Sequence, residues 1–61
     1  MITIEFSYKN PLGIWMESEK HFQTVDKAVR FMYVIQRSPK MVYMGFTCSD
    51  PQETEEMNRR I

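Results

Sequence analysis

The N-terminal segment alternates apolar and polar side chains more regularly than any other part of the chain. In "ITIEFSY", residues 2–8, Ile, Phe and Tyr occupy one set of alternate positions, and Thr, Glu and Ser occupy the other. This two-residue period predicts a half-buried β-strand. The following "KNPLG" contains Asn10, Pro11 and Gly13, which are turn-forming residue types, so we expect a wide hairpin loop. A second, less regular strand is predicted over residues 14–20, and its charged end suits a sheet edge.

A helical period follows the second strand. In "TVDKAVRFMYVIQRSP" the apolar residues recur every three to four positions, which is typical of a helix that packs through one face. Thr24 is a suitable N-cap, and Asp26 suits the positive end of the helix dipole. Pro39 lacks a backbone donor and therefore ends the helix.

A third strand is predicted over residues 41–48, "MVYMGFTC", but both of its faces carry apolar side chains. One set of alternate positions holds Val42, Met44, Phe46 and Cys48. The other set holds Met41 and Tyr43. A half-buried strand normally has one polar face. We expect the first set to face the helix and the second set to lie on the opposite, open face of the sheet.

The C-terminal segment, "SDPQETEEMNRRI", predicts a short helix. Ser49 or Asp50 is a suitable N-cap, and Pro51 suits the first helical position. Only Met57 and Ile61 form an apolar pair at helical spacing. We therefore expect this helix to be exposed and frayed.

Together these elements predict one small α+β domain over residues 1–61, with a core over 1–49 and a helical tail over 50–61. The element order is β-β-α-β followed by the short helix. Right-handed crossover favours the sheet order 2-1-3, with the first strand central and one helix packed on one face. The predicted core consists of Ile2, Ile4, Phe6, Ile14, Met16, Val25, Ala28, Val29, Met32, Ile35, Val42, Met44 and Phe46.

Composition limits how such a small domain gains stability. The chain has 61 residues with one Cys and one His, which excludes an intrachain disulfide and a His/Cys zinc cluster. A well-packed core or association with another chain is then the expected source of stability. The sequence contains neither a transmembrane run nor a signal-peptide pattern, and its single thiol favours a cytoplasmic protein.

Charge is balanced overall but segregated along the chain. The net charge is zero, which argues against a dedicated nucleic-acid-binding domain. Residues 20–40 nevertheless contain five basic residues and one acidic residue, whereas residues 50–56 contain four acidic residues and no basic one. The basic stripe indicates either an anionic partner or, as we favour, an ordinary solvated helix face. The candidate anion-binding residues are Lys20, Lys27, Arg30, Arg37 and Lys40.

The sequence offers little for catalysis. His21 and Cys48 are the only candidates for nucleophilic chemistry, and a lone Cys is more often a small buried hydrophobic residue. A chain of this length has little room for a substrate pocket, and it contains no Gly-rich phosphate loop. We therefore expect no enzyme activity, no small-molecule substrate, no cofactor and no metal.

The leading hypothesis is a protein-interaction module of unknown role. Trp15, Met41 and Tyr43 are predicted to lie on the open sheet face, and these residue types are enriched in interfaces. A homodimer or another protein would cover them; partial exposure, or cover by the C-terminal tail, is the alternative. The second hypothesis is a nucleic-acid-binding accessory protein that uses the basic stripe.

Overall fold

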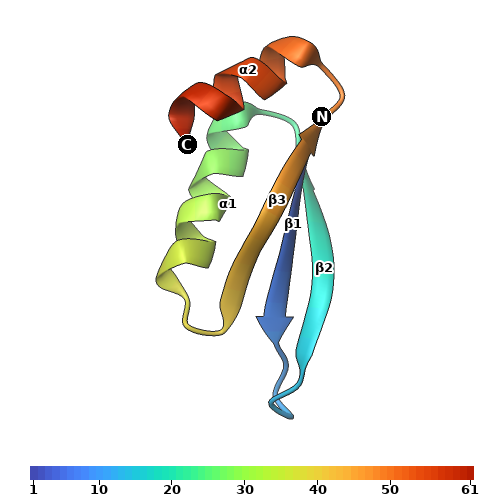
Figure 1. Cartoon of the computed structure of the whole chain (residues 1–61), viewed down its shortest axis with the longest axis vertical. Helices are drawn as coiled ribbons and strands as arrows, with labels where there is room; N and C mark the ends of the chain where they lie inside the picture. Colours follow the sequence, from blue (N-terminus) through green and yellow to red (C-terminus); the bar gives the residue numbers. More distant parts are fainter.

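The computed structural model describes residues 1–61 as a three-stranded antiparallel sheet and two helices (Figure 1). The sheet order is β2-β1-β3, so the predicted α+β class and the central position of the first strand are confirmed. The elements are β1 (Ile2–Lys9), β2 (Trp15–Phe22), α1 (Val25–Arg37), β3 (Met41–Cys48) and α2 (Pro51–Arg60).

The core lies between the sheet and α1. β1 pairs with both other strands, so its apolar face is in the middle of the sheet, under the helix. Ile2, Ile4 and Phe6 are buried there. The helix contributes the residues predicted by its 3.6-residue period: Val25, Ala28, Val29, Met32 and Ile35 are buried.

Local side-chain hydrogen bonds determine where the elements begin. The Thr24 hydroxyl accepts a hydrogen bond from the Lys27 amide at 3.3 Å and caps α1, as predicted. In the β1–β2 hairpin, the Asn10 side-chain oxygen accepts hydrogen bonds from the Leu12 and Ile14 amides at 2.9 and 3.0 Å. Gly13 has a φ of 82°, a left-handed conformation that favours glycine.

The hairpin extends past the C-terminal end of α1 (Figure 1). No helix covers this end of the sheet, and both Ile14 and Met16 are exposed. Their predicted place in the core is therefore wrong. β2 is an edge strand whose side chains are exposed along nearly its whole length, with Phe22 the one exception. The helix layer thus covers mainly β1 and β3.

A β-bulge interrupts the pairing of β1 with β3. Glu5 is opposite Gly45, but the next residue, Phe6, is opposite Tyr43. Met44 is the extra residue, and the bulge reverses the faces of the strand on its N-terminal side. One strand thus places apolar side chains of both parities toward the same core.

The bulge overturns the predicted faces of β3. Met41 and Tyr43 pack against the core, on the same side as Phe46. Val42 and Met44, which were expected in the core, point to the opposite face and are 51% and 53% exposed. The expectation that Met41 and Tyr43 lie on the open face is therefore wrong.

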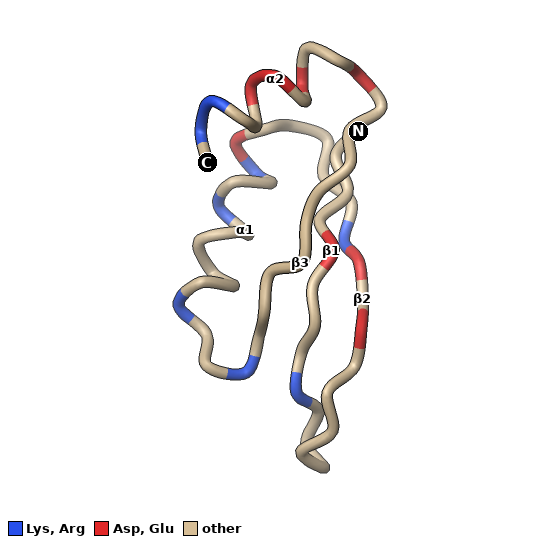
Figure 2. Tube along the Cα trace, in the orientation of Figure 1, with Lys and Arg blue, Asp and Glu red and all other residues tan.

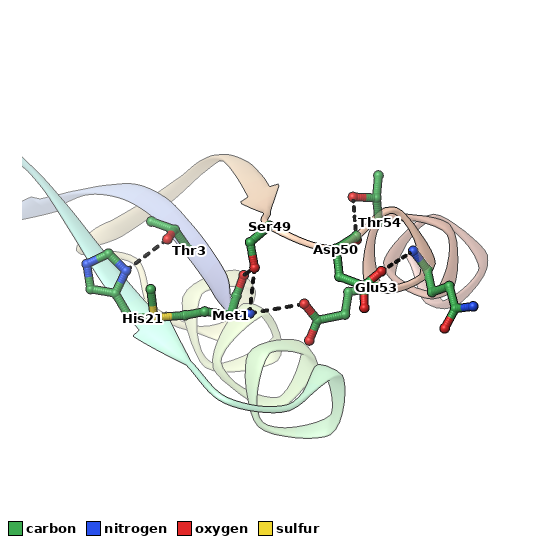
Figure 3. A network of polar contacts seen from close by, with 8 residues as sticks. Met1, Thr3, His21, Ser49, Asp50, Glu53 and Thr54 are labelled. Carbon is green, nitrogen blue, oxygen red and sulfur yellow. Dashed lines mark hydrogen bonds and ion pairs between the residues drawn. The ribbon is translucent and has the colours of Figure 1, made fainter.

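The C-terminal helix docks on the rest of the molecule. Met57 is 0% exposed and belongs to the core cluster, so the expectation of an exposed helix is wrong at this residue. The Asp50 carboxylate accepts a hydrogen bond from the Gln52 amide at 2.9 Å and caps α2. The N-terminal amine of Met1 donates to the Glu53 carboxylate at 3.1 Å (Figure 3). These contacts place α2 across the first turns of α1 (Figure 1).

Candidate protein-interaction surfaces

The sheet face opposite α1 is covered by neither helix. The registers of β2 and β3 on β1 place their side chains in cross-strand rows. One row contains Glu17, Ser7 and Val42, and the next contains Glu19, Glu5 and Gly45. We call this surface the open sheet face; it consists of Thr3, Glu5, Ser7, Lys9, Trp15, Glu17, Glu19, His21, Val42, Met44 and Thr47.

Carboxylates dominate the middle of the open sheet face. Glu5, Glu17 and Glu19 line a hollow of about 390 Å³ together with Ser18 and Met44. Glu5 and Glu17 form no ion pair, and the Glu19 carboxylate lies 3.8 Å from the His21 ring. No group of three His, Cys, Asp or Glu residues is arranged to hold a metal ion. The hollow is thus an acidic surface feature without a coordination geometry.

Two hydrogen bonds join side chains of the open sheet face. The Thr3 hydroxyl is hydrogen-bonded to His21 Nδ1 over 2.8 Å, and Figure 3 marks this contact with a dashed line. The Ser7 hydroxyl donates to Met44 Sδ at 3.1 Å. The second contact places the thioether of the bulge residue over the centre of the sheet.

Of the three predicted interface residues, only Trp15 lies on the open sheet face, where it is 48% exposed. Met41 and Tyr43 lie on the covered face, and partial burial raises the pKa of the Tyr43 hydroxyl. The apolar side chains that replace them are Val42 and Met44. In the sequence, only Gly45 signalled that the faces of β3 reverse along the strand, because glycine inside a strand often marks a bulge.

The basic residues of α1 form a second exposed surface. Lys27, Arg30 and Arg37 project away from the sheet, and none forms an ion pair. Tyr33 and Val34 lie among them and are half-exposed. We call these five residues the α1 outer face. Figure 2 shows the basic positions along α1 and the acidic positions on β1 and β2.

Lys20 and Lys40 lie outside α1. The Lys20 ammonium lies 5.2 Å from the ring centroid of Phe31 and 5.9 Å from that of Phe22, so it makes cation–π contacts. Lys40 lies in the turn between α1 and β3. Three of the five predicted anion-binding residues therefore lie on the α1 outer face.

The acidic residues of the C-terminal helix leave the α1 outer face unpaired. Arg60 of α2 forms an ion pair with Asp26 of α1. The hydrogen bond from Arg60, together with its charge, lowers the pKa of Asp26. The Glu53 carboxylate accepts a hydrogen bond from the N-terminal amine of Met1. The one acidic side chain on α1 is thus paired with Arg60 of α2, and Lys27, Arg30 and Arg37 form no ion pair.

His21 and Cys48, the two candidates for nucleophilic chemistry, lie on opposite faces. His21 is hydrogen-bonded to Thr3 on the open sheet face. Cys48 packs against the core on the covered face. Central strand β1 separates the two edge strands that carry them. The structure does not bring them together as a nucleophile and base.

Comparison with known proteins shows no matching family model, no similar curated protein and no similar solved structure. No helix of the chain has the length and apolar character needed to cross a membrane. The molecule thus presents two candidate binding surfaces: the open sheet face is acidic and apolar, and the α1 outer face is basic and apolar.

Proposed function

We propose that the chain is a small non-enzymatic protein-interaction module that binds protein, further copies of itself included, through the open sheet face. The observation that carries this proposal is a complete sheet face without a helix, on which Trp15, Val42 and Met44 are about half exposed. Aromatic residues and Met are enriched in interface cores. A partner on this face would also add a second apolar layer to a small domain with nine buried residues.

The chemistry of the hollow supports a binding role over a catalytic one. Its side chains are carboxylates, a serine and a thioether, and no thiol or imidazole lines it. Acid–base catalysis by carboxylates depends on desolvation that shifts their pKa values. Glu5, Glu17 and Glu19 are instead exposed to solvent.

Affinity capture tests the proposal. The purified chain, immobilised, would be incubated with lysate of its source cells, and retained proteins would be quantified by mass spectrometry. The double substitution Val42→Thr, Met44→Gln removes apolar surface from the open sheet face. We expect at least about fivefold lower retention of the bound proteins, since an interface side chain of this kind contributes about 1 kcal/mol or more.

A matched control removes the same kind of surface elsewhere. Leu12 is 84% exposed at the hairpin tip, and Ile61 is exposed after α2. The double substitution Leu12→Gln, Ile61→Gln should retain the same proteins as the parent. Equal retention by the parent and both variants would contradict a role for the open sheet face.

Nucleic-acid binding through the α1 outer face is the second candidate function. It is favoured by Lys27, Arg30 and Arg37, which are exposed and form no ion pair. Phosphate contacts make binding steeply salt-dependent. Retention of the parent on heparin, with elution at lower salt for the Arg30→Gln, Arg37→Gln variant, together with a gel shift of labelled RNA or DNA, would support it. A chain that flows through at low salt and shifts neither nucleic acid would exclude it.

A cytoplasmic location is also proposed. It is supported by the unpaired thiol of Cys48, because free thiols persist in reducing compartments. A fluorescent fusion observed in source cells would test it, and accumulation outside the cytoplasm would contradict it.

A further inference from the structure

We propose that copies of this chain associate head to tail: the open sheet face of one copy binds the α1 outer face of the next. This inference rests on the proposed function, since it names the partner of the open sheet face as a second copy. The contact is heterologous, so each copy would use two different surfaces.

Charge determines which pairs of surfaces attract. The open sheet face carries Glu5, Glu17 and Glu19 at its centre, with Lys9 at the hairpin end. The α1 outer face carries three cations without ion pairs. A two-fold contact between two open sheet faces would oppose carboxylates to carboxylates, and one between two helices would oppose cations to cations. Only the head-to-tail contact brings opposite charges together.

Both surfaces also carry exposed apolar side chains beside their charges. Arg30 and Val34 lie on the side of α1 opposite the buried stripe, and Tyr33 is next to them. Val42 and Met44 lie along β3 on the open sheet face, beside the carboxylates of β1 and β2. A helix lying along the sheet would therefore meet an apolar strip on the β3 side and carboxylates on the β2 side, which matches its own mixture of apolar and basic residues.

The dimensions of the two surfaces also agree. α1 has 13 residues, a length of about 20 Å, and the strands have eight residues each, a length of about 26 Å. Three strands span about 10 Å between the outer two, close to the diameter of about 10–12 Å of one helix. One helix thus covers the open sheet face and completes a three-layer arrangement.

The size of the contact predicts its strength and its growth. A single helix on a three-stranded sheet belongs to the small interfaces, below about 1,200 Å² of total buried area, that form weak complexes. Association should therefore require high protein concentration and low salt. Because a head-to-tail contact leaves one of each surface free, the assembly should grow beyond a dimer unless it closes into a ring.

Sedimentation velocity across a concentration series at low salt tests the inference. The parent should gain mass with concentration, and about 0.5 M NaCl should reverse the gain. The sheet-face variant Glu17→Gln, Glu19→Gln and the helix-face variant Arg30→Gln, Arg37→Gln should each associate at least about tenfold more weakly. The sign of this change is diagnostic, because removing like charges would strengthen either two-fold contact.

Charge-matched controls separate the surfaces from net charge. The Glu55→Gln, Glu56→Gln variant removes two acidic residues from α2, and the Lys40→Gln, Arg59→Gln variant removes two basic residues outside the α1 outer face. Both should associate like the parent. An equimolar mixture of the sheet-face and helix-face variants retains one intact pair of surfaces, so it should form dimers with the affinity of the parent contact and grow no further.

Two outcomes would overturn the inference while leaving the proposed function in place. A parent that is monomeric at every concentration would show that the open sheet face does not bind a second copy. Tighter association of the sheet-face variant would show a two-fold contact between sheet faces. If affinity capture is also independent of Val42 and Met44, the proposed function itself fails.

Discussion

Met57 is the residue that joins the C-terminal helix to the core. Its side chain is 0% exposed and lies in one cluster with Val25, Ala28 and Val29 of α1. Its sequence context, "ETEEMNRR", contains no other apolar residue. A single methionine therefore supplies nearly all the apolar contact of α2, a role for which its flexible side chain is well suited.

Replacing Met57 by Ala should strongly destabilise the protein. Truncation of a buried Met costs about 2–5 kcal/mol, while a 61-residue domain has a total stability of about 3–9 kcal/mol. Urea denaturation followed by far-UV circular dichroism would measure the loss. Met44→Ala is the control of identical chemistry at an exposed position, and it should change stability by less than about 0.5 kcal/mol. Equal effects at the two positions would contradict the burial of Met57.

The ion pair between Asp26 and Arg60 predicts an acid-sensitive contribution to stability. Arg60 lowers the pKa of Asp26 in the folded chain. The ion pair therefore stabilises the fold above the unfolded pKa of about 3.9, and its contribution is lost as pH falls through the lower folded pKa. Both side chains are exposed, so the effect should be small and should disappear in about 1 M salt.

Thermal unfolding of the parent and of Asp26→Asn at several pH values would test this contribution. We expect the parent to be the more stable of the two at pH 7, and the difference should vanish as the pH approaches 2. A difference that is independent of pH would contradict the assignment to this ion pair.

At the scale of the elements, periodicity predicts the type and order of each strand and helix. The alternation of residues 2–8 and the period of residues 25–37 determine β1 and α1, since burial on one face requires those spacings. The faces of β3 could not be predicted from its period, because the bulge at Met44 reverses them halfway along the strand. The interface prediction consequently placed Met41 and Tyr43 on the wrong face, while correctly separating Trp15 from the core.

The hairpin depends on one glycine. Gly13 has a φ of 82°, and a β-carbon there would meet no atom closer than Lys9 Cε at 3.7 Å. Gly13→Ala is therefore disfavoured by backbone conformation and not by a collision, and it should destabilise the chain by about 1–2 kcal/mol. Leu12→Ala, one position earlier and highly exposed, should be nearly neutral. Urea unfolding of both variants would test this, and equal stabilities would contradict the role of the left-handed turn.

For the whole molecule, the two helices differ in how they are held. α1 is amphipathic and contributes five buried residues, a pattern visible in the sequence. α2 contributes one, and its polar contacts join parts of the chain that are far apart, Met1 with Glu53 and Asp26 with Arg60. Contacts between such distant residues produce no periodic pattern in the sequence. The docking of α2 could therefore not be predicted from the sequence.

Removing α2 should therefore abolish cooperative folding. A chain that ends after Ser49 keeps the hydrogen bond between the Met1 amine and the Ser49 hydroxyl, but it loses Met57 and both ion pairs of α2. The apolar surface of α1 beneath Met57 would then be exposed to solvent. A domain of this size has a small free energy of unfolding, so this loss should be large in proportion. We expect this chain to show a broad, weakly cooperative urea transition by circular dichroism. Deletion of the exposed Ile61 alone should leave the transition unchanged. A sharp transition for the shortened chain, within about 1 kcal/mol of the parent, would show that the sheet and α1 fold without α2.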